Sequence, residues 1–298
     1  MSRAVSPSRK RPYGVARVTA VWKMARSSFY AARQRREQPR VPAKRGPKVL
    51  SDDELLTEIR KLLAAPMYSG EGHRKVWARL RHQGTRTSKD RVLRLMRENQ
   101  LLSPSRLAPL RLVHPHEGTI VTEAPNLMWG TDATQTTTEE EGTVTIFAAL
   151  DHYSADCVGI HVAKRGDRFE ALEPIRQDVR EHCGGVSAAV AAGMRLRHDH
   201  GSVYMSDDFQ KEIRFLGMES SPAFVRQPEG NGCIERFFRT LKEQLLWVRR
   251  FRNIEELRQA LREFRQRYND HWILQRLGYQ TPNQARRNFA PVERQIAA

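Results

Sequence analysis

Residues 127–132 read LMWGTD, a short run that resembles a strand and ends on a carboxylate. Two similar runs follow it, TVTIFAAL at 143–150 and CVGIHV at 157–162, with turn-rich segments between them. Runs of this length that are rich in β-branched and aromatic residues, and bounded by turn formers, are typical of strands. Their close spacing along the chain predicts three strands in an antiparallel meander.

After these strands the pattern alternates between helix and strand. We expect a helix over 168–181, a loop over 186–193, a fourth strand over 194–199 that again ends on an aspartate, and helices over 207–216, 233–248 and 254–268. The order βββαβα followed by helices predicts an α/β or α+β domain. Neither a GxGxxG motif after a strand nor a GxxxxGK[ST] motif occurs, so a nucleotide cofactor is not indicated.

Charge separates the front of the chain from the rest. The 298 residues include 51 Lys and Arg against 34 Asp and Glu, a net charge of +17. Residues 1–100 hold 25 basic and 8 acidic residues, whereas 101–298 hold 26 of each. This asymmetry predicts that residues 1–100 bind a polyanion, and nucleic acid is the usual partner when helical motifs accompany a basic segment. A solvated basic tail over residues 2–48 is the alternative.

Helical patterns within the basic front suit a helix-turn-helix domain. Ser51 and Glu54 form a capping box ahead of an apolar helical face, and further helices are expected over 73–83 and from Ser88. The basic residues expected to project outward are Arg74, Lys75, Arg79 and Arg81 on the second helix, and Lys89, Arg91, Arg94 and Arg97 on the third. We interpret this as a DNA-binding module, with a small helical bundle carrying solvated arginines as the alternative.

Composition, apolar segments and cysteine spacing limit the class of protein further. With 39% apolar residues the chain can bury a sizeable core in two or three domains. No window approaches the roughly 18 apolar residues of a membrane span, and no apolar signal core follows the basic N-terminus, so we expect a cytoplasmic protein and no membrane partner. Cys157, Cys183 and Cys233 lack metal-site or disulfide-framework spacing and are expected to be buried thiols. Residues 14–36 form a weaker helical segment, which could be part of another helix-turn-helix, and 42–47 have the composition of a linker.

Three carboxylates could converge on one site. Asp132 and Asp199 each end a predicted strand, where ligand-binding residues gather, and Glu235 lies in the first turn of the helix over 233–248. The predicted buried stripe of that helix is Ile234, Phe237, Phe238, Leu241, Leu245 and Val248, which leaves Glu235, Arg239, Lys242 and Leu246 on the adjoining flank. Glu235 and Lys242 are two turns apart and point the same way, so they could bind a metal ion and a phosphate. A solvated helix face with a Glu235–Arg239 pair is the alternative.

Other titratable residues near these acids have structural interpretations. Asp151 is expected at a strand end or turn, and the Asp207-Asp208 pair at a helix N-terminus, where carboxylates are favoured. Asp156 is a further rival acid. His198 and His200 flank Asp199, but strand alternation sends both to the opposite face, so we interpret them as structural.

Taken together, these residues resemble the orfB half of bacterial insertion-sequence transposases of the IS-three group, within the retroviral-integrase-like DDE superfamily. The matching segments are WGTD at 129–132, DHGSVY at 199–204, GNGCIERFFRTLK at 230–242, YN at 268–269 and TP at 281–282. Residues 51–104 resemble the helix-turn-helix segment of the family, so the resemblance covers about 50–290. The chain departs from the family at His198, where serine is common, at Gly230, and over 69–73.

The resemblance implies an α/β fold with an RNase H-like mixed sheet flanked by helices, preceded by an all-α helix-turn-helix domain. The implied domains are a basic segment with a weak partial helix-turn-helix over 1–48, the helix-turn-helix domain over 49–103, a linker over 104–124, the integrase-like catalytic core over 125–290 and a tail over 291–298.

The resemblance also implies a DDE transposase that cleaves the ends of an insertion sequence and transfers the strands to a target. Asp132, Asp199 and Glu235 would be its catalytic residues and would bind two Mg²⁺ (or Mn²⁺) ions. The expected DNA contacts are Lys242, Arg239 and Asn231 in the core, with Arg74, Lys75, Lys89, Arg91 and Arg94 in the helix-turn-helix domain. The expected partners are double-stranded DNA at element ends and target, an orfA-type protein or fusion, and further copies of the chain. A decayed DNA-binding protein and a metal-dependent nuclease of the same fold are the alternatives.

Overall fold

The structure is a computed structural model that describes residues 3–37, 50–68, 70–103, 120, 122–223 and 231–289. The chain divides into two compact units, Met1–Leu55 and Leu56–Ala298, and each is described by itself. The predicted linker over 42–47, most of the predicted linker over 104–124, Gly230 and the predicted tail lie outside the described residues. Within the described residues, no helix has the length and apolar content to cross a membrane.

The first unit contains two short helices, α1 (Gly14–Val21) and α2 (Arg26–Glu37). The weak helical segment predicted over 14–36 is therefore interrupted, and the second helix begins at the Arg26-Ser27-Ser28 stretch. In α1 the Thr19 hydroxyl is buried and donates to the Val15 carbonyl at 2.8 Å, as hydroxyl side chains commonly do within helices.

Three helices and one 3₁₀ turn follow, namely α3 (Asp52–Ala64), η1 (Pro66–Tyr68), α4 (His73–His82) and α5 (Lys89–Glu98). The predicted starts are confirmed. Ser51 and Glu54 form the capping box, with the Ser51 N–H donating to the Glu54 carboxylate at 2.6 Å, and Ser88 accepts from the Arg91 N–H at 3.1 Å. This is the expected all-α domain.

A five-stranded mixed sheet forms the centre of the domain that follows the helical one in the chain, with its strands in the order β3-β2-β1-β4-β5. Its strands are β1 (Met128–Thr138), β2 (Gly142–Asp151), β3 (Cys157–Ala163), β4 (Arg195–His198) and β5 (Glu219–Pro222). The first three form the predicted antiparallel meander, whereas β4 pairs parallel to β1 and β5 pairs parallel to β4. The predicted mixed sheet is thus confirmed.

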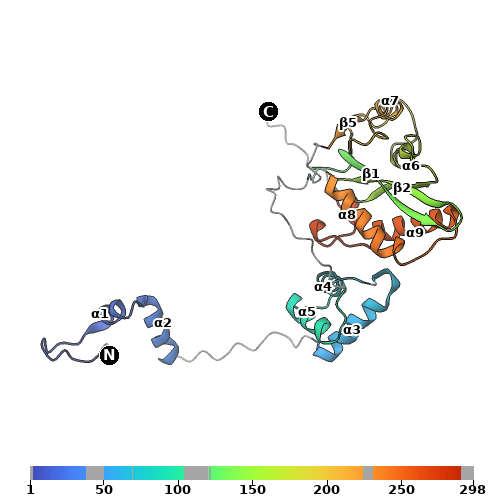
Figure 1. Cartoon of the computed structure of the whole chain (residues 1–298). Helices are drawn as coiled ribbons and strands as arrows, with labels where there is room; N and C mark the ends of the chain where they lie inside the picture. Colours follow the sequence, from blue (N-terminus) through green and yellow to red (C-terminus); the bar gives the residue numbers. More distant parts are fainter. Residues whose placement is uncertain are drawn as a thin grey trace, which may run out of the picture. The chain divides into compact units, whose positions relative to one another are not determined.

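Two apolar cores cover the two faces of this sheet (Figure 1). On one face lie α6 (Glu173–His182), which follows the 3₁₀ turn η2 (Glu170–Leu172), and α7 (Asp207–Phe215). On the other face lie α8 (Gly232–Leu241) and α9 (Ile254–His271). Alternate residues of β2 serve the two cores, with Ala148 beneath α8 and α9 and Phe147 beneath α6 and α7.

Two strand predictions need correction. The first strand does not end at Asp132, because β1 continues to Thr138 and pairs with β2 along its whole length. Its second half is a run of threonines, whose β-branched side chains suit a strand although they are polar. The strand β5 was not predicted at all, since its sequence ESSP has no apolar side chain and it forms through backbone pairing with β4.

The helix that carries Glu235 also departs from the prediction. The helix predicted over 233–248 is α8 followed by one π-helical turn, η4 (Lys242–Leu246). The wider turn shifts the buried stripe by one residue, so that Leu246 is buried and Val248 is exposed, the reverse of the prediction. The chain then forms α9, the 3₁₀ turn η5 (Gln275–Leu277) and α10 (Pro282–Arg287), which begins with a Thr281–Gln284 capping box.

Candidate active site

The strand β1 at the middle of the sheet places Asp132. Asp132 lies opposite Ala148 in the antiparallel ladder, and Ala148 belongs to the core beneath α8 and α9. Opposed residues share a face, so the Asp132 side chain is directed toward the α8 layer. One carboxylate oxygen, Oδ1, accepts from the Ala133 N–H at 2.8 Å.

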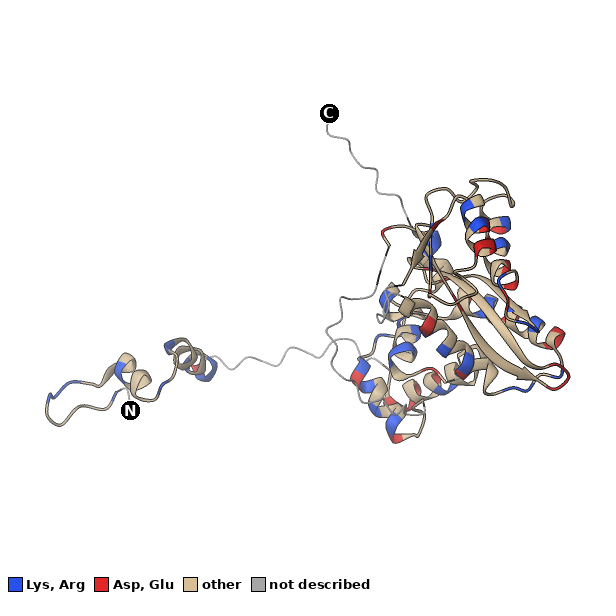
Figure 2. Cartoon of the chain, turned by 45° about the horizontal axis from the view of Figure 1, so that its top comes forward, with Lys and Arg blue, Asp and Glu red and all other residues tan. Residues whose placement is uncertain are grey.

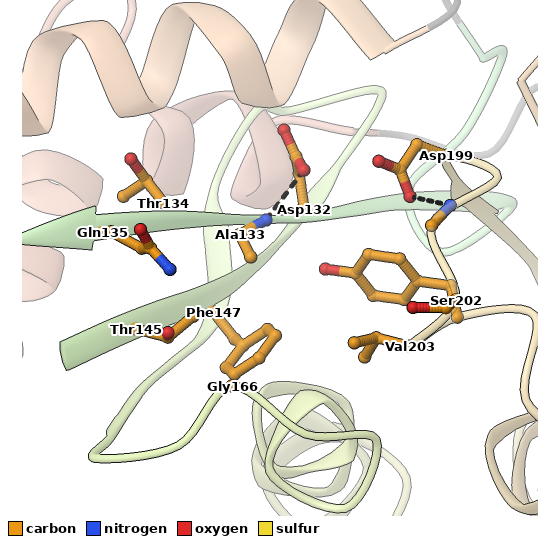
Figure 3. A pocket seen from close by; sticks show the side chains of 12 residues that line it. Asp132, Ala133, Thr134, Gln135, Thr145, Phe147, Gly166, Asp199, Ser202 and Val203 are labelled. Atoms are coloured by element: carbon orange, nitrogen blue, oxygen red, sulfur yellow. Dashed lines mark hydrogen bonds between the residues drawn. The ribbon is translucent and has the colours of Figure 1, made fainter. Parts of the chain in front are cut away.

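The neighbouring strand β4 places Asp199 beside Asp132. Gly130 pairs with Arg197 in the parallel ladder, so each aspartate lies two residues beyond this paired position. Asp199 is exposed, and its Oδ1 accepts from the Gly201 N–H at 2.8 Å. In Figure 3 both carboxylates extend to the same side, away from Phe147. The two aspartates line one open cleft of about 400 Å³, together with Thr134, Gln135, Ser202, Tyr204 and neighbouring residues.

The helix α8 supplies the third acid. Its N-terminus is tied to β1 by Asn231, whose side-chain amide donates to the Thr131 carbonyl at 3.1 Å. Glu235 lies in the first turn of α8 and is exposed. Burial of part of this side chain raises the pKa of the Glu235 carboxyl, while Arg236 lowers it. The described residues provide no hydrogen bond or ion pair to Glu235, so its carboxylate is available to a ligand.

The electrostatics of Asp132 connect these three acids. Burial, and then the like charges of Asp199 and Glu235, raise the pKa of Asp132 to about 6, against the opposing effects of the Ala133 N–H and of Lys242. A charge influences a pKa in this way only at short range, so Asp132, Asp199, Glu235 and Lys242 share one local field. The predicted convergence of the three acids is therefore consistent with the structure.

This cluster of acids suits a hard divalent cation. Three carboxylates offer only oxygen atoms, which are the ligands that Mg²⁺ and Mn²⁺ prefer, and the mutual repulsion that raises the Asp132 pKa would be relieved by a cation. The residues present therefore fit the expected metal. Lys242 on the same flank of the helix could balance a phosphate.

A different group of titratable side chains lies on α6, and it was not predicted from the sequence. Asp178, Glu181 and His182 have ligand atoms within 4.8 Å of one another. These side chains already have protein partners, because His182 contacts the buried Asp178 carboxylate and Glu181 binds Arg265 at 2.7 Å. We interpret the group as a structural charge network that attaches α6 to α9.

Two of the core residues predicted to contact DNA are placed as expected on the exposed flank, and one is not. Arg239 is half-exposed and pairs with Glu243 at 3.1 Å, not with Glu235, so the predicted alternative pairing does not form. Lys242 is half-buried. Asn231 is only 7% exposed and binds the β1 backbone, so the prediction of a DNA contact is corrected to a positioning role.

Figure 2 marks the Lys and Arg residues of the chain in blue, and the contacts of two of those on helix α4 direct them inward. The ammonium of Lys75 lies 3.3 Å from the centroid of the Trp272 ring, so the predicted outward contact with DNA is corrected. Arg79, also predicted to face outward, is buried. It forms a bidentate ion pair with Glu71, with both distances 2.6 Å, and donates to the His271 carbonyl at 2.7 Å. Long cationic side chains have apolar stems that tolerate such burial when the charge is paired.

Other predicted basic residues remain on the surface. Arg74 is exposed and donates to Gln275 at 3.3 Å. On α5, Lys89 is exposed, Arg91 is half-buried, and the exposed Arg94 pairs with Glu98 at 3.0 Å. Of the two helices, α5 therefore presents more of the cations that could reach a DNA backbone.

The rival titratable residues have structural partners. Asp151 is fully buried and accepts from the N–H groups of Asn126, Tyr153 and Ser154. Asp156 pairs with Arg286 at 3.2 Å, Asp208 pairs with Arg168 at 2.6 Å, and Asp207 begins α7 as expected.

The two histidines beside Asp199 also have structural partners. His198 contacts the Asp199 carbonyl at 2.7 Å and the Ser220 hydroxyl at 2.9 Å, while His200 contacts the Ala223 carbonyl at 2.7 Å. Cys157 and Cys233 are buried thiols as predicted, and Cys183 is partly exposed.

Tyr204 is a site residue that sequence reasoning did not single out. Its ring lines the cleft beside Asp132 and Asp199, and it is only 3% exposed. Burial, and then the charge of Asp132, raise the pKa of the Tyr204 hydroxyl well above its ordinary value. Its place five residues after Asp199, within the DHGSVY segment, is the signal that could have identified it.

Comparison with known protein families finds two matches along the chain. The family described as integrase core domain matches residues 216–282, and the family described as HTH-like domain matches residues 51–108. A 48.2 kDa protein of insertion element IS2A from Escherichia coli is 25% identical over 293 residues, which is 96% of this chain and 68% of that protein. Transposase InsD of insertion element IS2 from Escherichia coli is 26% identical over 245 residues, 80% of each chain.

Two solved structures are also similar. The simian T-cell lymphotropic virus intasome, in complex with a PP2A regulatory subunit, is 19% identical, has a TM-score of 0.49 and covers 76% of each chain. The HTLV-2 integrase catalytic core domain in complex with magnesium is 16% identical, has a TM-score of 0.41 and covers 55% of this chain and 98% of that one.

The chain thus contains a segment similar to an integrase core domain, and upstream of it a segment similar to an HTH-like domain. The chain is homologous to the IS2 InsD transposases of insertion elements. The predicted resemblance to insertion-sequence transposases is thereby confirmed.

Proposed function

We propose that this chain is a DDE transposase, which cleaves the ends of an insertion sequence in a metal-dependent reaction and transfers the freed strands to target DNA. Its homology to transposases supports a role in transposition and an enzyme that acts on DNA. The observation that supports the finer proposal is that Asp132 and Asp199, from two strands, line one cleft, and that Glu235, from a helix, carries a charge that raises the Asp132 pKa. Carboxylates that share a site in this way are typical of metal-assisted phosphoryl transfer.

Asp132, Asp199 and Glu235 would hold two Mg²⁺ (or Mn²⁺) ions. When bound, such ions stabilise the attacking and leaving oxygens of an in-line displacement at phosphorus. The chain positions these ligands with backbone N–H groups, because Ala133 and Gly201 each donate to one aspartate at 2.8 Å. The remaining oxygens of both carboxylates stay open to the cleft.

The surroundings of the acids would bind and align the DNA. Lys242 and Arg239 follow Glu235 along one flank of α8 and would contact phosphates near the cleaved bond. Asn231 fixes the N-terminus of α8 against β1 and so sets the position of Glu235 relative to Asp132. Water would attack first at the element end, and the freed 3′-hydroxyl would then attack a target phosphodiester.

The assembly around this site follows from the proposed reaction. Joining two element ends to one target requires both ends to be held together, so we expect more than one copy of the chain on DNA. The basic cations of α5 and the basic residues 1–48 would hold the ends, and an orfA-type protein or fusion would supply further recognition of them. Sedimentation of the protein with duplexes of its element end would show assemblies larger than one chain per duplex.

A strand-transfer reaction tests the proposal. Purified protein is incubated in Mg²⁺ or Mn²⁺ with supercoiled plasmid and a labelled duplex of its own element end. Wild type should join label to plasmid and Glu235→Gln should not, whereas the control Glu219→Gln, on the exposed surface of β5, should join like wild type. Cutting without joining would identify a nuclease, and binding without cutting, even with the upstream partner added, would identify a decayed DNA-binding protein.

A further inference from the structure

Two large apolar side chains are exposed just beyond the helix that carries Glu235. Trp247 is 70% exposed and Val248 is 69% exposed, although the residues before and after them are anchored. Leu246 and Phe251 belong to the core beneath α8 and α9, and the Phe251 carbonyl accepts from the Glu139 N–H at 3.1 Å. The exposure of the pair is therefore a feature of an anchored turn next to the helix that carries Glu235.

The π-helical turn determines which way Trp247 points. The Trp247 N–H donates to the Lys242 carbonyl at 2.9 Å, five residues back. Residues joined by such a bond lie nearly one above the other, whereas in an α-helix, at about 100° per residue, five residues would separate them by about 140°. The turn thus brings Trp247 onto the flank that carries Glu235 and Lys242. Turns of this kind occur frequently at functional sites.

The charges near Trp247 suit a nucleic acid strand. Arg249 and Arg250 follow directly, and both are exposed. Arg249 is held by Glu256 at 2.7 Å, whereas in the described part of the chain no hydrogen bond or ion pair engages Arg250. An exposed indole ring between Lys242 and Arg250 combines a stacking surface with cations for the backbone, which is the usual composition of a single-strand binding surface.

We propose that Trp247 stacks on an unpaired base of a DNA strand that runs along this flank, with Lys242 and Arg250 on its phosphates. The proposal deepens the proposed function, on which it rests for the identity of the strand. Trp247 lies 12 residues beyond Glu235, about 18 Å along the helix at about 1.5 Å per residue. DNA opened near the site would present such a base.

Equilibrium binding without metal tests this inference separately from catalysis. The full chain is titrated, in EDTA, into a fluorescein-labelled 20-nucleotide oligothymidylate and into a duplex of the same length, and anisotropy is measured. Trp247→Ala should weaken single-strand binding by about 5- to 150-fold, the range for loss of one base–aromatic stack, and should weaken duplex binding less. Trp247→Phe should retain most of the affinity because it keeps an aromatic ring.

Two further variants sharpen the result. Phe215→Ala removes another exposed aromatic ring, 49% exposed on α7 at the opposite face of the sheet, and should leave binding unchanged. Arg250→Gln should reduce the slope of log affinity against log salt by about 0.7, the value for one phosphate contact on a single strand. Arg249→Gln should change this slope less, since Arg249 is already paired.

Each outcome bears on the inference. Unchanged single-strand affinity of Trp247→Ala would overturn it, and would assign the exposed pair to a contact with a second copy if sedimentation showed that the same variant loses an oligomer. Equal loss on single strand and duplex would overturn the stacking role. If wild type fails to transfer strands while the Trp247 variants behave as expected, the proposed function is wrong and the single-strand binding surface is retained.

Discussion

Removal of the Glu71 carboxylate should destabilise the protein strongly. Glu71 is 2% exposed, its carboxylate accepts two hydrogen bonds from Arg79 at 2.6 Å, and the guanidinium also lies over the Tyr68 ring. Breaking a buried ion pair by deleting one partner typically destabilises by about 3–5 kcal/mol, because the other charge stays buried without compensation. Loss of two charge-assisted hydrogen bonds, at about 1.5–3 kcal/mol each, gives a similar magnitude.

Urea unfolding of Glu71→Ala, followed by circular dichroism, measures this loss. The double variant Glu71→Leu with Arg79→Met removes both charges, and should recover at least about 2 kcal/mol relative to the sum of the single variants. Glu58→Ala, which removes a partly exposed glutamate of α3, serves as the control. A free energy of unfolding within about 1 kcal/mol of wild type for Glu71→Ala would show that the buried Glu71–Arg79 pair contributes no more than a typical exposed ion pair.

Three more outcomes follow from local geometry. Gly159→Ala should destabilise the core by at least about 1–3 kcal/mol in urea unfolding, because its Cβ would lie 1.9 Å from the Pro174 carbonyl oxygen on α6; a neutral effect would contradict the close packing. Lys242→Ala should weaken DNA binding and reduce the salt slope on duplex by about 0.9, and an unchanged slope would exclude a phosphate contact. The hydrogen bond from Arg265 lowers the pKa of Glu181, so this pair should stabilise the fold above the ordinary glutamate pKa and lose that contribution as pH falls through the lowered value. Unfolding measured against pH should therefore lose part of its acid dependence in Arg265→Leu, and identical profiles would contradict the pairing.

The strands and helices of the core could be predicted because each has a strong local pattern. The apolar runs at 143–150 and 157–162 became β2 and β3, since both of their faces are buried between helices. By contrast, β5 has no apolar residue to signal it, and the polar second half of β1 is a strand because β2 provides its backbone partners. Backbone pairing of this kind depends on distant segments and leaves little trace in local sequence.

In the candidate site, too, the features with a local sequence pattern could be predicted and those that depend on distant segments could not. Asp199 could be found from a strand end and Glu235 from a helix start, whereas Asp132 lies within β1 and was found through the resemblance and an expected strand end that the structure does not have. The parallel register of β1 and β4 explains why Asp132 and Asp199 line one cleft. The inward direction of Lys75 could not be found, because its partner Trp272 lies nearly two hundred positions away in the sequence. For Arg79, the nearby Glu71 gave no local signal of burial, and its second partner, the His271 carbonyl, is equally remote. The π-helical turn was also missed, since helical periodicity assumes a constant 3.6 residues per turn.

The central claim is that Asp132, Asp199 and Glu235 form one metal-dependent strand-transfer site. The most direct test is joining of a labelled element end to plasmid by wild type, Asp132→Asn, Asp199→Asn and Glu235→Gln, with folding of each checked by circular dichroism and the upstream partner supplied. Wild type should form joined product in Mg²⁺ or Mn²⁺ and none in EDTA. None of the three folded variants should form joined product. Joined product from the triple variant that carries all three of these substitutions would contradict the assignment of Asp132, Asp199 and Glu235 as the catalytic residues.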